Sequence, residues 1–100
     1  MTKYQARKAR LKEAYGITPV QWLKIWTLQG GKCPICLKPI WKPGNKEGKR
    51  AAAVDHDHLT GRVRGLLDYR CNRYIIGRNS ADRAERVYRY LTSEFDGRAL

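Results

Sequence analysis

The sequence predicts a small α+β domain in which a β-hairpin is followed by a helix, with a cysteine knuckle and flanking helices. Two strand-like segments, 52–55 and 62–67, are separated by a short polar stretch that can form the loop of a hairpin. The segments on both sides have helical periodicity. A chain of 100 residues makes one domain, 1–100, and its core is small enough that a metal site is a natural means of stabilisation.

Two helices are expected ahead of the hairpin. Segment 1–15 is basic and helix-compatible, and Gly16 ends it. Thr18 is a typical N-cap, because a proline occupies the next position and Gln21 follows three residues after the cap. The second helix has a broad apolar surface that includes Trp22, which is expected to pack in the core.

The three cysteines indicate metal or thiol chemistry. Cys33 and Cys36 form a Cys-x-x-Cys pair, whereas Cys71 is preceded three positions earlier by Asp68. Their number is odd and the N-terminus lacks the apolar segment of a signal peptide, so we expect a reducing cytoplasm rather than a disulfide framework. Three thiolates can hold a structural zinc ion with Asp68 as the fourth ligand. Alternatively, the cysteines are buried without metal and Asp68 only caps the next helix.

Two further helices are expected after the hairpin. One begins near Asp68 and runs to Gly77. The other occupies 80–96, with Ser80 as its N-cap. This last helix carries an apolar stripe that consists of Ala84, Val87, Tyr88, Leu91 and Phe95.

The charge of the chain indicates a polyanionic partner. There are 21 Lys and Arg against 9 Asp and Glu, and the whole excess of +12 lies in the first 80 residues, because acids and bases balance from Ala81 onward. Neutralisation of phosphates by such residues drives sequence-independent binding to nucleic acid. A basic surface that only keeps the protein soluble is the alternative. No apolar run has the length of a membrane span, and no cationic helix has the apolar face that a membrane surface requires.

A run of alternating carboxylates and imidazoles, Asp55-His56-Asp57-His58, lies at the end of the first strand. A carboxylate binds a hard divalent cation, and a nearby imidazole takes a proton from water at neutral pH. Hydrolysis of a phosphodiester requires both functions. A polar turn without chemistry is the alternative.

This part of the chain resembles the recombination endonuclease VII family of phage HNH nucleases. The resemblance rests on Val54-Asp55-His56-Asp57-His58, on Thr60-Gly61-Arg62-Val63-Arg64-Gly65-Leu66-Leu67 and on Cys71-Asn72-Arg73. Cys33-x-x-Cys36 and Ile17-Thr18-Pro19 also fit the family, so the resemblance covers residues 16–79. It implies a ββα-metal (HNH) hairpin and helix held by a zinc knuckle.

The resemblance also implies roles for individual residues. Asp55 and Asn72 would hold a catalytic Mg²⁺ or Mn²⁺ ion. His56 would activate water, and His58 would assist it. A zinc site at Cys71 would fix the start of the helix and bring the Asn72 amide oxygen toward Asp55. The arginines near this motif are expected to contact DNA phosphates, unless they form only a solvated basic face: Arg62, Arg64, Arg70 and Arg73.

Two departures from the family pattern bear on function. Asp68 stands where the family has a third zinc cysteine, and Ile75 stands where the founding phage resolvase has an active-site glutamate. We expect a metal-dependent DNA endonuclease with little sequence specificity, because no base-reading motif is present. The alternative is a catalytically weak zinc-knuckle DNA-binding accessory protein of a phage packaging or recombination machine. The expected partners are DNA, linear or branched, and a second copy of the chain or another phage DNA-processing protein, in the cytoplasm of the bacterial host.

Overall fold

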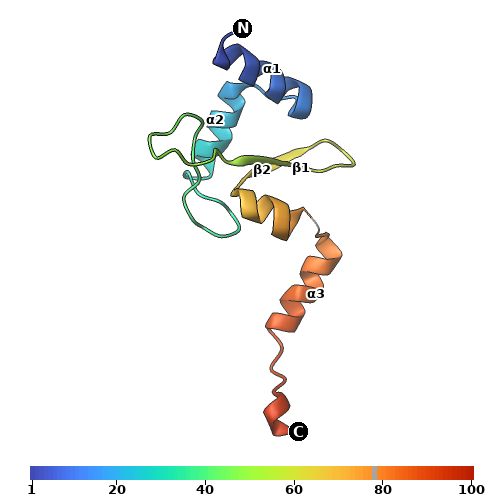
Figure 1. Ribbon diagram of the computed structural model, residues 1–100. Coiled ribbons are helices and arrows are strands. Elements are labelled where there is room, and N and C mark those ends of the chain that lie inside the picture. The colour runs from blue at the N-terminus through green and yellow to red at the C-terminus, as the bar shows by residue number, and fades with distance from the viewer. Residues whose placement is uncertain (78) are drawn as a thin grey trace.

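A computed structural model describes residues 1–77 and 79–100 of the chain. Its elements, in chain order, are α1 (Lys3–Tyr15), α2 (Pro19–Leu28), β1 (Ala53–His56), β2 (Val63–Leu67), η1 (Cys71–Ile76), α3 (Ala81–Leu91) and η2 (Gly97–Ala99). Figure 1 shows the hairpin in the middle, with α1 and α2 on one side and the helix that contains η1 on the other. The mixed architecture of helices and one small antiparallel sheet confirms the predicted α+β class.

The end of α1 and the start of α2 lie at the residues that the sequence predicts. Thr18 accepts a hydrogen bond from the Gln21 N–H at 3.1 Å, and the Gln21 side chain accepts one from the Thr18 N–H at 2.8 Å. Gly16 ends α1 with a φ of 72°, a conformation that costs glycine less than any other residue. The predicted capping box and helix stop are therefore confirmed.

The sheet is a two-stranded antiparallel hairpin with one irregularity. Ala53 pairs with Leu67 and Asp55 with Gly65, but His56 pairs with Val63. Arg64 is therefore an extra residue on β2, which forms a β-bulge. Bulges re-aim side chains and are common next to active sites.

The core lies where α2 meets the hairpin. Leu66 and Cys33 are fully buried, and Trp22 is buried as predicted. The Gln29 side chain donates to the Leu66 carbonyl and accepts from the Leu66 N–H, both at 2.8 Å, so it pairs with the free edge of β2 as a strand would. A Cβ at Gly65 would lie 2.9 Å from the Gln29 side-chain oxygen, so this close approach requires glycine.

The helix after the hairpin contains a π-helical segment, η1, from Cys71 to Ile76. This segment is wider than an ordinary α-helix. The Gly77 N–H donates to the Asn72 carbonyl at 2.8 Å, five residues back. A Cβ at Gly77 would lie 2.7 Å from that carbonyl oxygen. Short π-type turns inside helices occur frequently at functional sites, and this one carries Asn72.

The C-terminal helix is shorter than the sequence predicts. Ser80 caps α3 by accepting from the Arg83 N–H at 3.2 Å, but the helix ends at Leu91 and not at 96. The physical reason is that the following polar side chains bind their own backbone: Ser93 accepts from the Phe95 N–H. No residue of α3 is buried, so its apolar stripe is exposed. Among the described residues, no helix is long and apolar enough to span a bilayer.

Candidate active site and cysteine cluster

The hairpin, the start of α3 and the helix that contains η1 enclose an open cleft of 780 Å³. Most of the residues that the sequence predicts to be catalytic or to bind DNA line it: Asp55, His56, His58, Arg62, Arg64, Asn72 and Arg73. Residues from strands and helix therefore converge on one cavity. Arg70 does not line the cleft, although it is exposed.

The two histidines lie side by side at the end of β1. The ring centroids of His56 and His58 are 4.6 Å apart, and Tyr15 contacts the His56 ring edge-on at 5.2 Å. Tyr15 is the last residue of α1, so the N-terminal helix reaches the cleft. Sequence reasoning missed this contact, because periodicity indicates only that Tyr15 lies on an apolar face.

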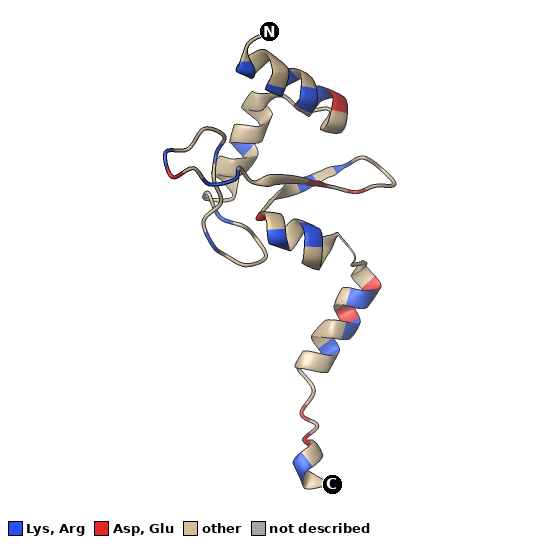
Figure 2. Cartoon of the chain, in the orientation of Figure 1, with Lys and Arg blue, Asp and Glu red and all other residues tan. Residues whose placement is uncertain are grey.

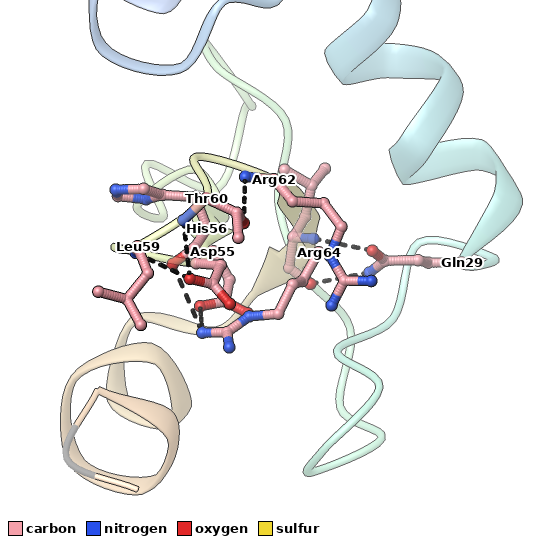
Figure 3. Close-up of polar contacts among 9 residues, drawn as sticks. Gln29, Asp55, His56, Leu59, Thr60, Arg62 and Arg64 are labelled. Atoms are coloured by element: carbon pink, nitrogen blue, oxygen red, sulfur yellow. Dashed lines mark hydrogen bonds and ion pairs between the residues drawn. The ribbon is translucent and has the colours of Figure 1, made fainter. Parts of the chain in front are cut away.

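Asp55 is buried and its carboxylate is held by Arg64 (Figure 3). The Arg64 Nε donates to one carboxylate oxygen at 2.8 Å, and Nη2 donates to the other at 3.0 Å. The bulge in β2 aims the guanidinium across the hairpin toward Asp55. This pairing raises the pKa of Arg64, chiefly through the hydrogen bond to Asp55. Arg64 therefore neutralises a cleft carboxylate and is not a free cation.

Asp57 shapes the hairpin loop. Its carboxylate accepts hydrogen bonds from the N–H groups of Leu59 at 2.8 Å and Thr60 at 3.1 Å. These two bonds are the main reason that the pKa of Asp57 lies below its usual range. The second carboxylate of the motif thus forms a turn, which leaves Asp55 as the buried carboxylate in the cleft.

Asn72 is half-buried on η1, directly after Cys71. Its backbone N–H donates to the Asp68 carbonyl at 2.9 Å, and its carbonyl accepts from the Gly77 N–H. Its side-chain amide makes no hydrogen bond within the described parts of the chain. The amide oxygen is therefore available to a ligand in the cleft.

The sulfur atoms of Cys33, Cys36 and Cys71 lie within 4.8 Å of one another, and all three cysteines are free. Cys33 and Cys71 are buried. Burial, followed by the nearby sulfurs of Cys33 and Cys36, raises the pKa of Cys71 to about 12. Burial also opposes ionisation of Cys33, but hydrogen bonds from backbone N–H groups outweigh it and lower the Cys33 pKa. The cluster can hold a metal ion, as the spacing predicts.

Asp68 does not belong to the cysteine cluster in this structure. Its carboxylate accepts from the Arg70 N–H at 2.8 Å, at the start of the helix that continues into η1. Its backbone N–H is among the groups that lower the pKa of Cys33. The structure therefore shows the capping arrangement, with Asp68 close to the cluster through its backbone.

Basic residues lie on several elements of the chain (Figure 2), and three of them, Arg62, Arg64 and Arg73, line the cleft. The blue segments, which mark Lys and Arg, lie on α1, on the hairpin and on the helix that contains η1. Tyr69 also lines the cleft, and the Arg50 guanidinium lies 4.2 Å from the centre of its ring. Sequence reasoning found neither Arg50 nor Tyr69, since Arg50 belongs to a lysine-rich loop without a motif.

Comparison with known proteins gives a consistent picture. The sequence pattern of recombination endonuclease VII matches residues 8–93. Two relatives are each called Gene 59 protein. The one from Mycobacterium phage D29 is 42% identical over 86 residues, which cover 84% of this chain and 48% of the relative. The one from Mycobacterium phage L5 is 40% identical over 86 residues, which cover 84% of this chain and 49% of the relative. The chain thus spans about half the length of these curated relatives. No solved structure matches it.

Proposed function

Because the chain belongs to the recombination endonuclease VII family, we propose that it is a divalent-metal-dependent endonuclease that hydrolyses DNA phosphodiesters with little sequence specificity. The observation that carries the proposal is the convergence of Asp55, His56 and Asn72 on one open cleft. We further infer that the hairpin and the helix after it form a ββα-metal (HNH) unit.

The cleft offers oxygen ligands for a hard divalent cation. The carboxylate of Asp55 and the side-chain amide of Asn72 are the kinds of donor that Mg²⁺ and Mn²⁺ prefer. Such an ion, when bound, would polarise the phosphoryl group and stabilise the developing charge. Arg64 already donates one hydrogen bond to each oxygen of this carboxylate, so we propose that it gives up at least one of them when the ion binds. We propose that the freed guanidinium then faces the substrate phosphate.

His56 is the proposed general base. It is half-buried in the cleft, and the edge of Tyr15 fixes one side of its ring. His58, next to it, would relay or share the proton that His56 takes from the attacking water. A positioned base of this kind is typical of phosphodiester hydrolysis in a metal-assisted site.

The cysteine cluster fits a structural zinc ion. Three sulfur atoms within 4.8 Å of one another match the spacing of thiolates around one ion, since Zn–S distances are about 2.3 Å. We propose that Cys33, Cys36 and Cys71 hold zinc and that a water molecule completes the site. Because Asn72 follows Cys71, the ion would fix the position of an active-site side chain.

The charge supports DNA as the substrate. The net charge of +12 and the exposed Arg62 and Arg73 at the cleft suit phosphate contacts, which position a duplex without reading its sequence. We propose that the substrate is linear or branched DNA. We also propose that the protein acts in the cytoplasm of a bacterial host, with a second copy of the chain or another phage protein as its partner.

A second candidate function is favoured by one observation. The carboxylate of Asp55 is already neutralised by Arg64, so the site satisfies its charge without a metal. A zinc-knuckle DNA-binding accessory protein with weak catalysis would have the same arrangement.

A plasmid-nicking assay separates the two. We expect the wild-type, zinc-loaded protein to nick supercoiled plasmid with Mg²⁺ or Mn²⁺, and His56→Ala to lose about 10²–10⁴-fold in rate, the usual contribution of a general base. DNA affinity and melting temperature should be unchanged in this variant. His58→Ala, the matched histidine control, should lose less.

Two outcomes would contradict parts of this proposal. Nicking by purified His56→Ala at the wild-type rate would remove His56 from catalysis. Tight DNA binding by the wild type, without nicking in either metal, would favour the accessory function.

A further inference from the structure

Two guanidinium groups from separate segments meet on the ring of Tyr69. The Arg50 guanidinium, from the loop before β1, lies 4.2 Å from the ring centre. The Arg73 guanidinium, from η1, lies 5.9 Å from the same centre and donates to the phenol oxygen at 2.6 Å. The aromatic ring thus holds two cations that are 23 residues apart in the sequence.

Neither cation is neutralised. Within the described ranges, 1–77 and 79–100, no carboxylate lies within 4.0 Å of Arg50 or Arg73. Of the acidic groups nearby, Asp55 pairs with Arg64, whereas Asp68 lines the same small cavity as Arg50 but forms no ion pair with it. Two like charges that contact one ring without an ion-pair partner repel each other, and the phosphates of a polyanion that passes the ring would relieve the repulsion.

The pair lies at the edge of the cleft. Tyr69 and Arg73 line the cleft itself, whereas Tyr69, Arg50 and Lys49 line a smaller adjoining cavity of 180 Å³. Asp68 and several apolar residues also line this smaller cavity. Tyr69 therefore separates the site of the proposed chemistry from a second hollow in which two basic residues face one acidic residue. A polyanion that enters the cleft at His56 can continue past the Tyr69 ring into this hollow.

We propose that Arg50, Tyr69 and Arg73 form a binding site for a phosphate of the DNA backbone next to the scissile one. The identity of the polyanion rests on the proposed function. Guanidinium groups bind phosphate through two parallel hydrogen bonds. Their attachment to an aromatic ring reduces the side-chain freedom that binding would otherwise remove. The loop that contains Arg50 thereby becomes part of the substrate surface.

The test measures how DNA affinity depends on salt. Binding of a fluorescently labelled duplex is titrated over a range of NaCl concentrations, with zinc-loaded protein and no added divalent metal. Arg50→Ala should weaken binding and reduce the slope of log K against log salt by about 0.9, the value for one phosphate contact on duplex DNA. Arg86→Ala, which removes the same charge from the exposed surface of α3, should leave the slope unchanged.

Two further readouts separate a phosphate site from a packing contact. The melting temperature of Arg50→Ala should match that of the wild type, and in nicking assays KM should rise while kcat is retained. Tyr69→Phe keeps the ring but removes the oxygen that binds Arg73, so it should weaken binding less than Arg50→Ala.

The outcomes distinguish this proposal from the proposed function. An unchanged salt slope in Arg50→Ala, or an equal loss in Arg86→Ala, would overturn the phosphate site even if the protein nicks DNA. DNA binding with the expected loss of slope, but without nicking, would support the phosphate site and contradict the nuclease. Absence of DNA binding by the wild type would overturn both.

Discussion

The cysteine cluster and the cleft are two candidate metal sites that differ in burial and in how ready their ligands are. Cys33 and Cys71 are buried among core residues, and the three sulfur atoms are already gathered within 4.8 Å. The cleft is open, and its carboxylate is occupied by Arg64. Ligands of a structural metal are held in the folded core, whereas a catalytic metal must be accessible to substrate. The first site therefore belongs to the fold, and the second is built on it.

Cys71 and Asn72 connect the two sites. Cys71 points into the cluster while its neighbour Asn72 lines the cleft. Both residues lie on the widened helix that Gly77 closes against the Asn72 carbonyl, where adjacent side chains point in different directions. Substitutions in the cysteine cluster should therefore also perturb the cleft, whereas substitutions in the cleft should leave the cluster intact.

The largest effect is expected from removal of a zinc ligand. Cys71→Ser should prevent zinc binding and unfold the hairpin region, because zinc sites of this kind contribute on the order of 10 kcal/mol to folding. Circular dichroism and metal analysis of the purified protein would measure both. Addition of a zinc chelator to the wild type should have the same result.

Cys71→Ala is the matched control for the competing explanation. If the cysteines are only buried core residues, alanine is tolerated far better than serine and chelation changes nothing. If they hold zinc, both variants lose the ion. If the purified wild type contains no zinc and its melting temperature does not change with a chelator, the cysteine cluster is not a structural metal site.

A smaller effect is expected in the cleft. Arg64→Ala leaves the buried Asp55 carboxylate without its ion-pair partner. The zinc-loaded variant should therefore melt at a lower temperature than the wild type, and added Mn²⁺ should restore the melting temperature. Charge-assisted hydrogen bonds contribute about 1.5–3 kcal/mol, so the affinity of the zinc-loaded protein for Mn²⁺ should rise by roughly tenfold or more. Isothermal titration calorimetry would measure this.

Arg62→Ala is its control, since Arg62 lines the same cleft without an ion pair to Asp55. It removes one positive charge at a similar place, so its Mn²⁺ affinity should change only slightly. Equal Mn²⁺ affinities in wild type and Arg64→Ala would mean that Arg64 does not compete with the metal for Asp55.

The sequence predicts the local features of both sites better than their contacts. Thr18 and Gly16 mark helix ends through short-range hydrogen bonds and backbone conformation, so their roles can be read from neighbouring residues. The pairing of Arg64 with Asp55 depends on a bulge, which shifts the register of one strand. From the sequence alone, Arg64 is therefore predicted to bind phosphate, as Arg62 is.

Long-range contacts escape sequence reasoning for a similar reason. Tyr15 reaches His56 across 41 residues, and Arg50 reaches Tyr69 from a loop without any motif. Arg70 is close to the motif in sequence, but it lies outside the cleft. Sequence proximity is thus a poor guide on a helix, where adjacent residues point in different directions.

The smallest effect is expected at Asp68, which lies at the start of the helix that carries Cys71 and Asn72. The Asp68 carboxylate accepts from the Arg70 N–H, so we expect Asp68→Ala to cost about 1 kcal/mol of stability, as loss of a helix cap does, and to keep its zinc. Asp68→Asn is the decisive comparison. Asparagine caps helices as well as aspartate does, whereas a neutral amide is a much poorer zinc ligand than a carboxylate. Thermal melts and zinc analysis should therefore show Asp68→Asn close to the wild type in both respects. If Asp68→Asn instead loses zinc while its helix content is retained, the carboxylate completes the cysteine cluster, and Asp68 serves the metal rather than the helix.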